Sequence, residues 1–379
     1  MGIDSNIHYM NLISLFDFEA RARLCLPHNV WDFIEAGAMD ELTTRRNRTA
    51  FEALTLRPRL LRDVSERRLS TTVLGTEISL PVMIAPASDH MNAHPDGELA
   101  TARGAGMSDT LMILSTASNY SMEEVAENSS CPLWFHLFHA GYDLTKTLVE
   151  RAEASGYKAI VLTVDAPIPS PKERDIRNRY QRVFPLGNLR DHLPAEPRAD
   201  AQPRWELSSA RPLTWMDLPW LRSLTSLPVV LKGIRTAEDA HIAVESGIDG
   251  IFVSTQGGRL LDMTMSSIEA LPEVVGAVNG RAEVYLDSGV RRGSDVLKAL
   301  ALGARAVAIG RALFWGLAVN GADGVHSILE ILREELDRCL AYCGQTSVQN
   351  LETNLVGVPV GWGEIRMTRR QRDTDQQIV

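Results

Sequence analysis

Residues 283–311, EVYLDSGVRRGSDVLKALALGARAVAIGR, contain two short apolar runs separated by a glycine-rich loop and a helical stretch. The first run, EVYL, leads into the loop DSGVRRGSD, and the second, AVAIG, begins soon after the helical stretch ends at Gly303. Neither run alternates strictly between apolar and polar residues, which is typical of parallel strands buried on both faces. The stretch therefore predicts a strand, a helix and a second strand parallel to the first.

The same unit recurs along the chain from residue 81 onward. Helical candidates separate the apolar runs, and several of them end at glycine, the usual C-terminal stop of a helix. Eight buried strands that alternate with helices favour a TIM (β/α)8 barrel over the alternative, a doubly wound parallel sheet. The eight runs are PVMIAP (81–86), TLMILS (110–115), PLWFHLF (132–138), AIVLTVD (159–165), PVVLKG (228–233), GIFVS (250–254), EVYLDSG (283–289) and AVAIG (306–310).

Other segments flank or interrupt this pattern. Residues 1–80 are predicted to form a helical segment packed on a barrel that extends over residues 81–362. Residues 183–213 are rich in proline and charge, and they follow the fourth strand, on the barrel face where active sites lie. They are predicted to form a mobile lid, with a disordered insertion as the alternative. The tail, residues 363–379, is predicted to be disordered.

The composition is that of an ordinary globular protein, with 379 residues of which 45% are apolar and 23% charged. Its net charge of −9 argues against a nucleic-acid partner. No apolar run reaches the roughly 18 residues of a membrane span, and the N-terminus lacks the features of a signal peptide. The four cysteines form no metal-binding pattern, so we expect a cytoplasmic protein with reduced thiols and no metal site.

Two loops at the predicted strand ends are suited to a phosphate group. In TIM barrels the loops after strands seven and eight often hold phosphate, and here they contain Gly289 with Arg291 and Gly310 with Arg311. The glycines allow backbone N–H groups close to an anion, and the arginines offer planar forks that match phosphate oxygens. Asp287 is placed to accept hydrogen bonds from sugar or ribityl hydroxyls.

Two further strand ends carry unusual residues. Lys232 follows the apolar run PVVL, and a buried lysine needs an anionic partner. A core ion pair and a cofactor ring that gains negative charge are both compatible with it. The run GIFVS opens into a glycine-rich loop, where catalysis would be expected, yet the residue at the turn is the non-titrating Gln256.

Long segments of the chain resemble the FMN-dependent α-hydroxy-acid oxidase and dehydrogenase family, from about residue 8 to residue 345. The resemblance implies an FMN-binding barrel, an oxidoreductase and a homo-oligomer, commonly a tetramer. The segments that carry it are RPRLLRDVSERRLSTTVLG, PVMIAPAS, AHPDGELATARGA, LTVDAP, LKGIRTAEDA and LDSGVRRGSDVLKALALGARAVAIGR, together with the helical N-terminal segment.

The resemblance assigns the flavin site residue by residue. Lys232 would face the part of the ring that becomes negative on reduction, and His136 stands where the family usually has Gln. Ser288 replaces a family glycine. The full set of FMN contacts implied is Pro86, Ala87, Ser88, Ser115, His136, Thr163, Lys232, Asp287, Ser288, Gly289, Arg291, Gly310 and Arg311.

The catalytic end departs from the family pattern. Family members use a His to take the substrate hydroxyl proton, and Gln256 stands in its place. Asp165 matches the carboxylate that orients that His, and it would lack its usual partner. Lys172 replaces an arginine that would grip the substrate carboxylate, which leaves Arg259 as the retained arginine.

The predicted substrate pocket is also more apolar than the family pattern. Phe33 and Phe138 stand where the family has two tyrosines that contact substrate. His136 and His90 are candidates for a relocated base, with satisfied polar residues as the alternative. The predicted catalytic residues are Gln256, Arg259, Asp165, Lys172 and His136, and the predicted pocket residues are Phe33, Phe138, Thr255, Ser88 and His90.

These departures favour an FMN-dependent oxidoreductase that acts on a non-standard, carboxylate-bearing small molecule in specialised biosynthesis. A general base contributes about 10²–10⁴-fold in rate, so its loss argues against efficient oxidation of ordinary hydroxy acids. Three alternatives stay open: a flavin-dependent isomerase or lyase without net oxidation, a standard 2-hydroxy-acid oxidase with a relocated base, and an inactive FMN-binding protein.

Overall fold

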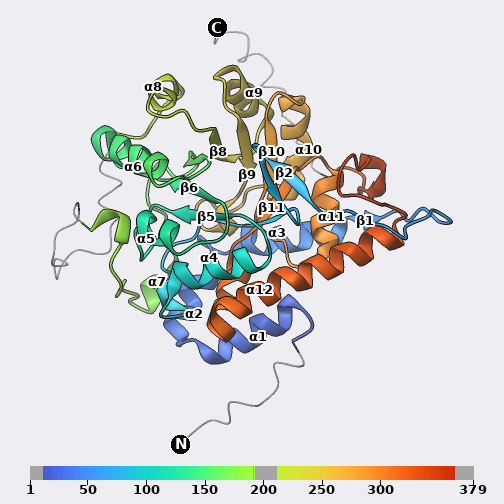
Figure 1. Ribbon diagram of the computed structural model, residues 1–379, viewed down its shortest axis with the longest axis horizontal. Helices are drawn as coiled ribbons and strands as arrows, with labels where there is room; N and C mark the ends of the chain where they lie inside the picture. Colours follow the sequence, from blue (N-terminus) through green and yellow to red (C-terminus); the bar gives the residue numbers. More distant parts are fainter. Residues whose placement is uncertain (1–11, 191, 193–210, 363–379) are drawn as a thin grey trace, which may run out of the picture.

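The computed structural model describes residues 12–190, 192 and 211–362, and it confirms the predicted TIM barrel (Figure 1). Eight parallel strands close in the order β10-β11-β4-β5-β6-β7-β8-β9. Seven lie within a predicted apolar run, and β8 extends one residue beyond its run, to Ile234. The strands are β4 Val82–Ile84, β5 Met112–Ser115, β6 Leu133–Leu137, β7 Ile160–Thr163, β8 Val229–Ile234, β9 Gly250–Val253, β10 Glu283–Leu286 and β11 Ala306–Ile309.

Helices follow the strands and surround the barrel (Figure 1). Their apolar faces join the outward side chains of the strands in one continuous core. The predicted helix start at TAED is confirmed, because the Thr236 side chain accepts from the backbone N–H of Asp239. The helices after the strands are α4 Gly97–Met107, α5 Met122–Glu127, α6 Tyr142–Ala154, α7 Glu173–Arg177, α8 Leu218–Ser223, α9 Ala237–Glu245, α10 Ser267–Val278, α11 Gly293–Ala301 and α12 Arg311–Tyr342.

A second, smaller core fills the barrel interior. Trp134 and Tyr285 meet edge to face with ring centroids 5.5 Å apart, and Phe252 packs on Tyr285. At the end where the strands begin, the hairpin of β2 Thr71–Val73 and β3 Thr76–Ile78 adds Val73 and Ile78 to this core. This end of the barrel is thus closed by apolar packing, and the polar residues gather at the opposite end.

The N-terminal segment is only partly helical, so the prediction for residues 1–80 is wrong in its second half. Its helices, α1 Leu15–Cys25, α2 His28–Glu35 and α3 Leu42–Ala53, are followed by short strands. β1 Thr55–Leu56 pairs with β12 Val356–Gly357, and the hairpin β2–β3 follows. The β-branched residues of TTV and TEI favour strand over helix, and Leu74–Gly75 forms the turn between them.

One part of the predicted lid, residues 186–189, is buried against the barrel. Leu186 and Leu189 are buried, and the N–H of Gly187 donates to the carbonyl of Ser118 at 2.9 Å. Residues 191 and 193–210, which make up most of the predicted lid, and the tail 363–379 lie outside the described residues. No helix in the described ranges is long and apolar enough to cross a membrane.

Candidate functional site at the carboxyl ends of the strands

Polar side chains predicted for the site meet where the parallel strands end. The strand register places Ser115 beside His136 and Thr163 beside Lys232. His136 Nε2 lies 2.6 Å from Thr163 Oγ1, and the Ser115 hydroxyl accepts from the N–H of Ala117. The structure therefore brings these four predicted residues together at the carboxyl end of the barrel, where TIM-barrel sites are built.

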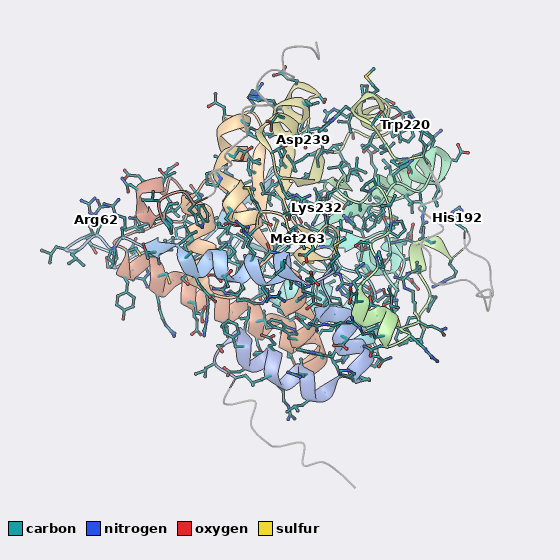
Figure 2. The ribbon with its side chains drawn as sticks, turned by 180° about the vertical axis from the view of Figure 1, so that it is seen from behind. Arg62, His192, Trp220, Lys232, Asp239 and Met263 are labelled. Carbon is teal, nitrogen blue, oxygen red and sulfur yellow. The ribbon has the colours of Figure 1, made fainter. Side chains whose placement is uncertain are left out.

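Lys232 lies near the middle of the molecule, with 1% of its surface exposed (Figure 2). Its Nζ lies 2.7 Å from Asp287 Oδ2 and donates to Ser254 Oγ at 2.7 Å. A third bond, of 2.9 Å, goes to Gln256 Oε1. The predicted core ion pair is thus present, and it joins the ends of β8 and β10.

Gln256 uses both ends of its amide. While Oε1 accepts from Lys232, Nε2 donates to Asp165 Oδ1 at 3.0 Å. Asp165 therefore has the Gln256 amide as its hydrogen-bond donor in place of the histidine that the resemblance implies. Burial raises the pKa of Asp165, whereas the charge of Lys232 and the bond from Gln256 oppose that shift.

Ser288, which replaces a family glycine, adopts a left-handed backbone with φ 75°. This conformation is costly for residues other than glycine. Its hydroxyl donates to Asp287 Oδ1 at 2.7 Å and accepts from the N–H of Gly257 at 3.0 Å. The side chain thus ties the Gln256 loop to the end of β10, a connection that glycine could not make.

The neighbouring glycines follow the ends of β10 and β11. Gly289 has φ 94°, and a Cβ there would collide with the backbone carbonyl of Asn47 in α3. Gly310 is the N-cap of α12, and a Cβ there would meet open space. The half-buried backbone of Pro86, Ala87 and Ser88 leaves the end of β4 at the same side of the barrel.

Arg259 binds the protein backbone rather than standing free in the pocket. Its Nη1 donates to the carbonyls of Phe33 at 2.8 Å, Ile34 at 3.2 Å and Ala36 at 2.9 Å, which end helix α2. Arg311 donates to the carbonyls of Ile34, Glu35 and Ala36 as well. Both cations therefore lie at the negative end of the α2 dipole.

Lys172 lies in the same region and is held by its own loop. Its Nζ donates to the carbonyl of Ser170 at 2.7 Å. Burial, together with the charge of Arg259, lowers the pKa of Lys172 to about 8. Burial likewise lowers the pKa of Arg259 to about 10, helped by the charge of Arg311. The site therefore holds two partly or fully buried cations, Lys172 and Arg259, close to each other.

Aromatic side chains line the cationic region. Phe33 stacks on Tyr180 with ring centroids 4.3 Å apart, and Arg259 lies over the Phe33 ring. Phe138 meets the His136 ring edge to face at 4.6 Å. Tyr180, whose hydroxyl accepts from Asn92 Nδ2 at 2.7 Å, was missed in the sequence. Its place after the site lysine, in the run KERDIRNRY, was the available signal.

A buried ion pair was also missed. Asp89, which is 0% exposed, accepts two hydrogen bonds of 2.7 Å from the guanidinium of Arg182. The pair joins the end of β4 to the segment before Leu186. The unusual run SDHMN after the first strand was the signal, but the partner at position 182 lies 93 residues away.

Three predicted pocket or catalytic residues are enclosed by protein. His90 and His136 are 1% and 3% exposed, and burial lowers the pKa of each to about 3. His90 Nδ1 lies 3.0 Å from Thr101 Oγ1, and its ring packs on Phe314. Thr255 accepts from Asn47 Nδ2 at 2.8 Å, so its hydroxyl is engaged with α3.

Comparison with known proteins identifies the family. The family model described as FMN-dependent dehydrogenase matches residues 22–358. The chain belongs to the FMN-dependent dehydrogenase family. It is 47% identical over 360 residues to an L-lactate oxidase from Nostoc sp., covering 91% of this chain and 98% of that protein. It is 45% identical over 350 residues to human 2-hydroxyacid oxidase 2, covering 92% of this chain and 99% of the relative.

A solved structure agrees with this assignment. A soluble mutant of the membrane-associated (S)-mandelate dehydrogenase from Pseudomonas putida superposes with a TM-score of 0.85 at 36% identity, covering 92% of this chain and 100% of the other. The protein is therefore an FMN-dependent oxidoreductase with the TIM-barrel fold of its family. When bound, FMN supplies a two-electron acceptor.

Arg291, beyond the end of β10, fits the phosphate of this cofactor, whereas Arg311 is already bound to Glu35 and to backbone carbonyls. The guanidinium of Arg291 makes no ion pair within the described ranges, and its one hydrogen bond goes to the adjacent carbonyl of Val290, while the backbone N–H donates to Asp295. Burial lowers the pKa of Arg291 to about 10, although the charges of Glu35 and Glu19 oppose this shift. The guanidinium is thus a buried cation with no carboxylate in direct contact in the described ranges. A phosphate would supply that missing charge.

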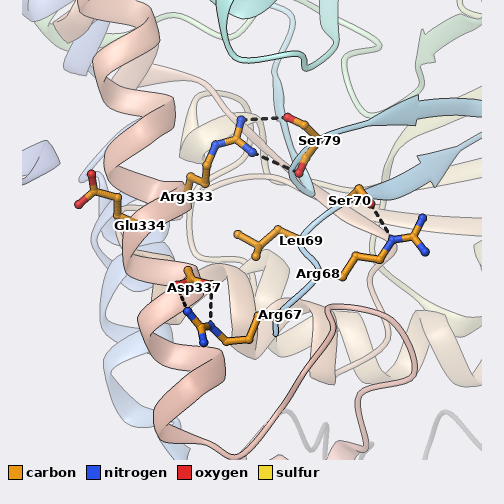
Figure 3. A pocket seen from close by; sticks show the side chains of 8 residues that line it. All are labelled: Arg67, Arg68, Leu69, Ser70, Ser79, Arg333, Glu334 and Asp337. Carbon is orange, nitrogen blue, oxygen red and sulfur yellow. Dashed lines mark hydrogen bonds and ion pairs between the residues drawn. The ribbon is translucent and has the colours of Figure 1, made fainter. Parts of the chain in front are cut away.

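A separate hollow of 510 Å³ lies away from this site (Figure 3). Its arginines are already engaged: Arg67 binds Asp337 through two bonds of 2.7 Å, Arg68 donates to Ser70, and Arg333 donates to Ser79. Ser79 precedes β4, so the hollow adjoins the end of the barrel where the strands begin. The chemistry belongs to the opposite end, and we assign none to this hollow.

Proposed function

We propose that this FMN-dependent oxidoreductase oxidises a carboxylate-bearing substrate other than the short 2-hydroxy acids. One observation carries the proposal: the amide of Gln256 spans from Lys232 Nζ, at 2.9 Å, to Asp165 Oδ1, at 3.0 Å. Family resemblance puts a histidine base at that position, and an amide takes up no proton at ordinary pH. The reaction in this protein therefore has a different proton acceptor.

The surrounding side chains support this choice of substrate class. Lys172 and Arg259 supply positive charge, which suits a carboxylate. Phe33, Phe138 and Tyr180 supply aromatic surface, which suits a substrate with an apolar body. Specialised biosynthesis and a cytoplasmic location are part of the same proposal.

A second candidate is ordinary 2-hydroxy-acid oxidation with a relocated base. The 47% identity to an L-lactate oxidase over nearly the whole chain favours it. The two candidates differ in which substrates react fastest, and one substrate panel decides between them.

The experiment is anaerobic mixing of the FMN-loaded protein with glycolate, L-lactate, (S)-mandelate and larger aryl- or alkyl-substituted hydroxy and amino acids. We expect bleaching of the flavin colour by a larger carboxylate at least 10²-fold faster than by glycolate or L-lactate. Rapid bleaching by L-lactate would instead establish the second candidate. Conversion of a substrate without net bleaching would indicate isomerisation or elimination, and both candidates would then be wrong.

Gln256→His tests the assignment of the turn residue, with Gln256→Ala as its matched control. We expect Gln256→His to restore activity toward glycolate and lactate by less than about tenfold, because Phe33, Phe138 and Lys172 are unchanged. Gln256→Ala loses both amide bonds and should lower activity toward the preferred substrate. A rise of 10² or more in lactate oxidation by Gln256→His would contradict the proposal that the whole pocket has diverged.

A further inference from the structure

Three titratable side chains near the ends of the strands are enclosed by protein or already hydrogen-bonded. His136 is enclosed, with Nε2 bound to Thr163, and His90 is enclosed between Thr101 and Phe314. Asp287 is occupied on both oxygens, by Lys232 Nζ at 2.7 Å and by Ser288 Oγ at 2.7 Å. The two histidines and this aspartate are therefore poorly placed to act as the base.

We propose that Asp165 is the catalytic proton acceptor of this protein, in place of the family's histidine. Asp165 follows β7 at the carboxyl end of the barrel and is only half-buried. Its Oδ1 accepts from Gln256 Nε2 at 3.0 Å, and its Oδ2 has no hydrogen-bond partner in the part of the chain that the structure describes. One carboxylate oxygen is thus held by the protein while the other is available.

This inference rests on the proposed function, because it names the group that receives the proton in that reaction. In a hydroxy acid the substrate O–H bond breaks, and in an amino acid the N–H bond breaks. The proton passes to Asp165 Oδ2, and the electron pair of the broken bond stays on the substrate oxygen or nitrogen. Gln256 is a positioning residue in this scheme, since its amide fixes the carboxylate through Oδ1.

The environment suits a carboxylate base near neutral pH. Burial is the largest influence and raises the pKa of Asp165, and the charge of Asp287 adds to it. Lys232, Gln256 and Arg235 oppose the rise. A base whose pKa moves toward the working pH is more effective than an ordinary aspartate. Gly233, with φ 115°, makes room, because a Cβ there would collide with the Asp165 carboxylate.

The first test uses Asp165→Asn, which keeps an acceptor for Gln256 but cannot take up a proton. With the preferred carboxylate of the panel, we expect the anaerobic bleaching rate to fall about 10²–10⁴-fold and the acid limb of its pH profile to disappear. Asp165→Glu should retain part of the activity with a shifted acid limb. The control Glu150→Gln, an exposed residue of α6, should stay within twofold of wild type.

The second test needs no substrate and measures Tm from pH 4 to pH 8. Because the folded-state pKa of Asp165 is raised, its contribution to stability is present at low pH and is lost as pH rises through the folded pKa. Asn does not titrate, so the Tm of Asp165→Asn minus the Tm of wild type should increase as pH rises.

The two tests fail in different ways. A Tm difference that stays constant from pH 4 to pH 8, or an Asp165→Asn protein that bleaches within threefold of wild type, would overturn the assignment of Asp165. A wild type that bleaches with no member of the panel would contradict the proposed function, and the Tm series would still decide whether Asp165 takes up a proton.

Discussion

Gln256 stands at a turn that few residue types tolerate. Its φ is 52°, and Gly257 and Gly258 continue the left-handed conformation with φ of 66° and 78°. A non-glycine residue in this region costs roughly 1–2 kcal/mol, so its contacts must compensate. The N–H of Gln256 donates to Ser254 Oγ at 3.0 Å, and its side chain binds Lys232 and Asp165. The backbone turn thus aims the amide between a cation and a carboxylate.

Lys172 leads to a prediction about pH. Because burial and Arg259 lower its pKa to about 8, Lys172 loses its charge as pH rises through 8. We expect the affinity of the holoenzyme for oxalate, a probe that carries only carboxylates, to weaken between pH 7 and pH 9. Lys172→Arg keeps its charge and should abolish this dependence, as measured by calorimetric titration. An unchanged dependence in Lys172→Arg would show that another group is responsible.

The depressed pKa also has a consequence for stability. Folding disfavours the charged form of Lys172, so the free energy of unfolding should rise as pH increases from 8 toward the ordinary value of 10.5. Lys172→Met should therefore be more stable than wild type at pH 7, and the difference should shrink above pH 8.

At the scale of elements, the segment from α7 to Leu189 is attached to the barrel by polar as well as apolar contacts. Arg182 binds Asp89, Tyr180 accepts from Asn92, and Leu186 and Leu189 are buried. Because Phe33 stacks on Tyr180, α2 is joined to the same assembly. These contacts form one wall of the site from three separate parts of the chain.

The Asp89–Arg182 pair predicts an asymmetric mutational result. Asp89 is 0% exposed and Arg182 side-chain exposure is 22%, so loss of the arginine leaves a buried, unpaired charge. We expect Arg182→Gln to lower the free energy of unfolding by about 3–5 kcal/mol and Asp89→Asn by less, as measured by urea denaturation. Arg177→Gln, which breaks an exposed pair with Glu173, should cost at most about 1 kcal/mol. Equal losses for the first two variants would contradict this account.

At the scale of the whole molecule, the barrel separates stability from chemistry. The end where the strands begin is closed by the hairpin β2–β3 and apolar side chains, whereas the other end holds Lys232, Gln256 and their partners. Helices α1 and α12 pack together outside the barrel (Figure 1). Substitutions in the two ends should therefore affect different properties.

We predict that the protein forms a homo-oligomer, and a projecting loop is a candidate for the contact between its chains. Leu60 is 81% exposed and Leu61 is fully exposed on the loop that carries Arg62 away from the body of the protein (Figure 2). Contiguous exposed apolar surface marks many contacts between chains, and these two leucines are adjacent in the sequence. We expect analytical ultracentrifugation to show a tetramer, and the double variant Leu60→Asp, Leu61→Asp to dissociate to smaller species.

Leu24→Asp is the matched control for this experiment, because Leu24 of α1 is exposed to a similar degree, 78%. Leu61 has φ 56°, which aspartate tolerates at least as well as leucine, so the double variant should fold. A wild type that sediments as a monomer would contradict the predicted assembly. A double variant that stays tetrameric would show that Leu60 and Leu61 do not form the contact between chains.

The eight strands, their order along the chain and the polar character of their ends could be predicted because each depends on a short run of neighbouring residues. A run such as AIVLTVD is apolar throughout because the strand it forms is buried on both faces. The departures at Gln256, Phe33, Phe138 and Lys172 were visible for the same reason, since each lies beside a segment that the family pattern identifies.

The sequence by itself determined the barrel, the family and therefore the cofactor, whereas only the tertiary structure decided which side chain meets which. Gln256 lies 91 positions from Asp165 and 24 from Lys232, yet its amide joins them. Likewise, Arg182 and Asp89 meet across 93 positions. Buried positions recur along the chain with the period of each helix or strand, and the apolar residues at those positions make them recognisable in the sequence. A hydrogen bond between side chains requires the donor and acceptor atoms to lie at the right distance to within a few tenths of an ångström, and the positions of separate strands are set only when the barrel closes.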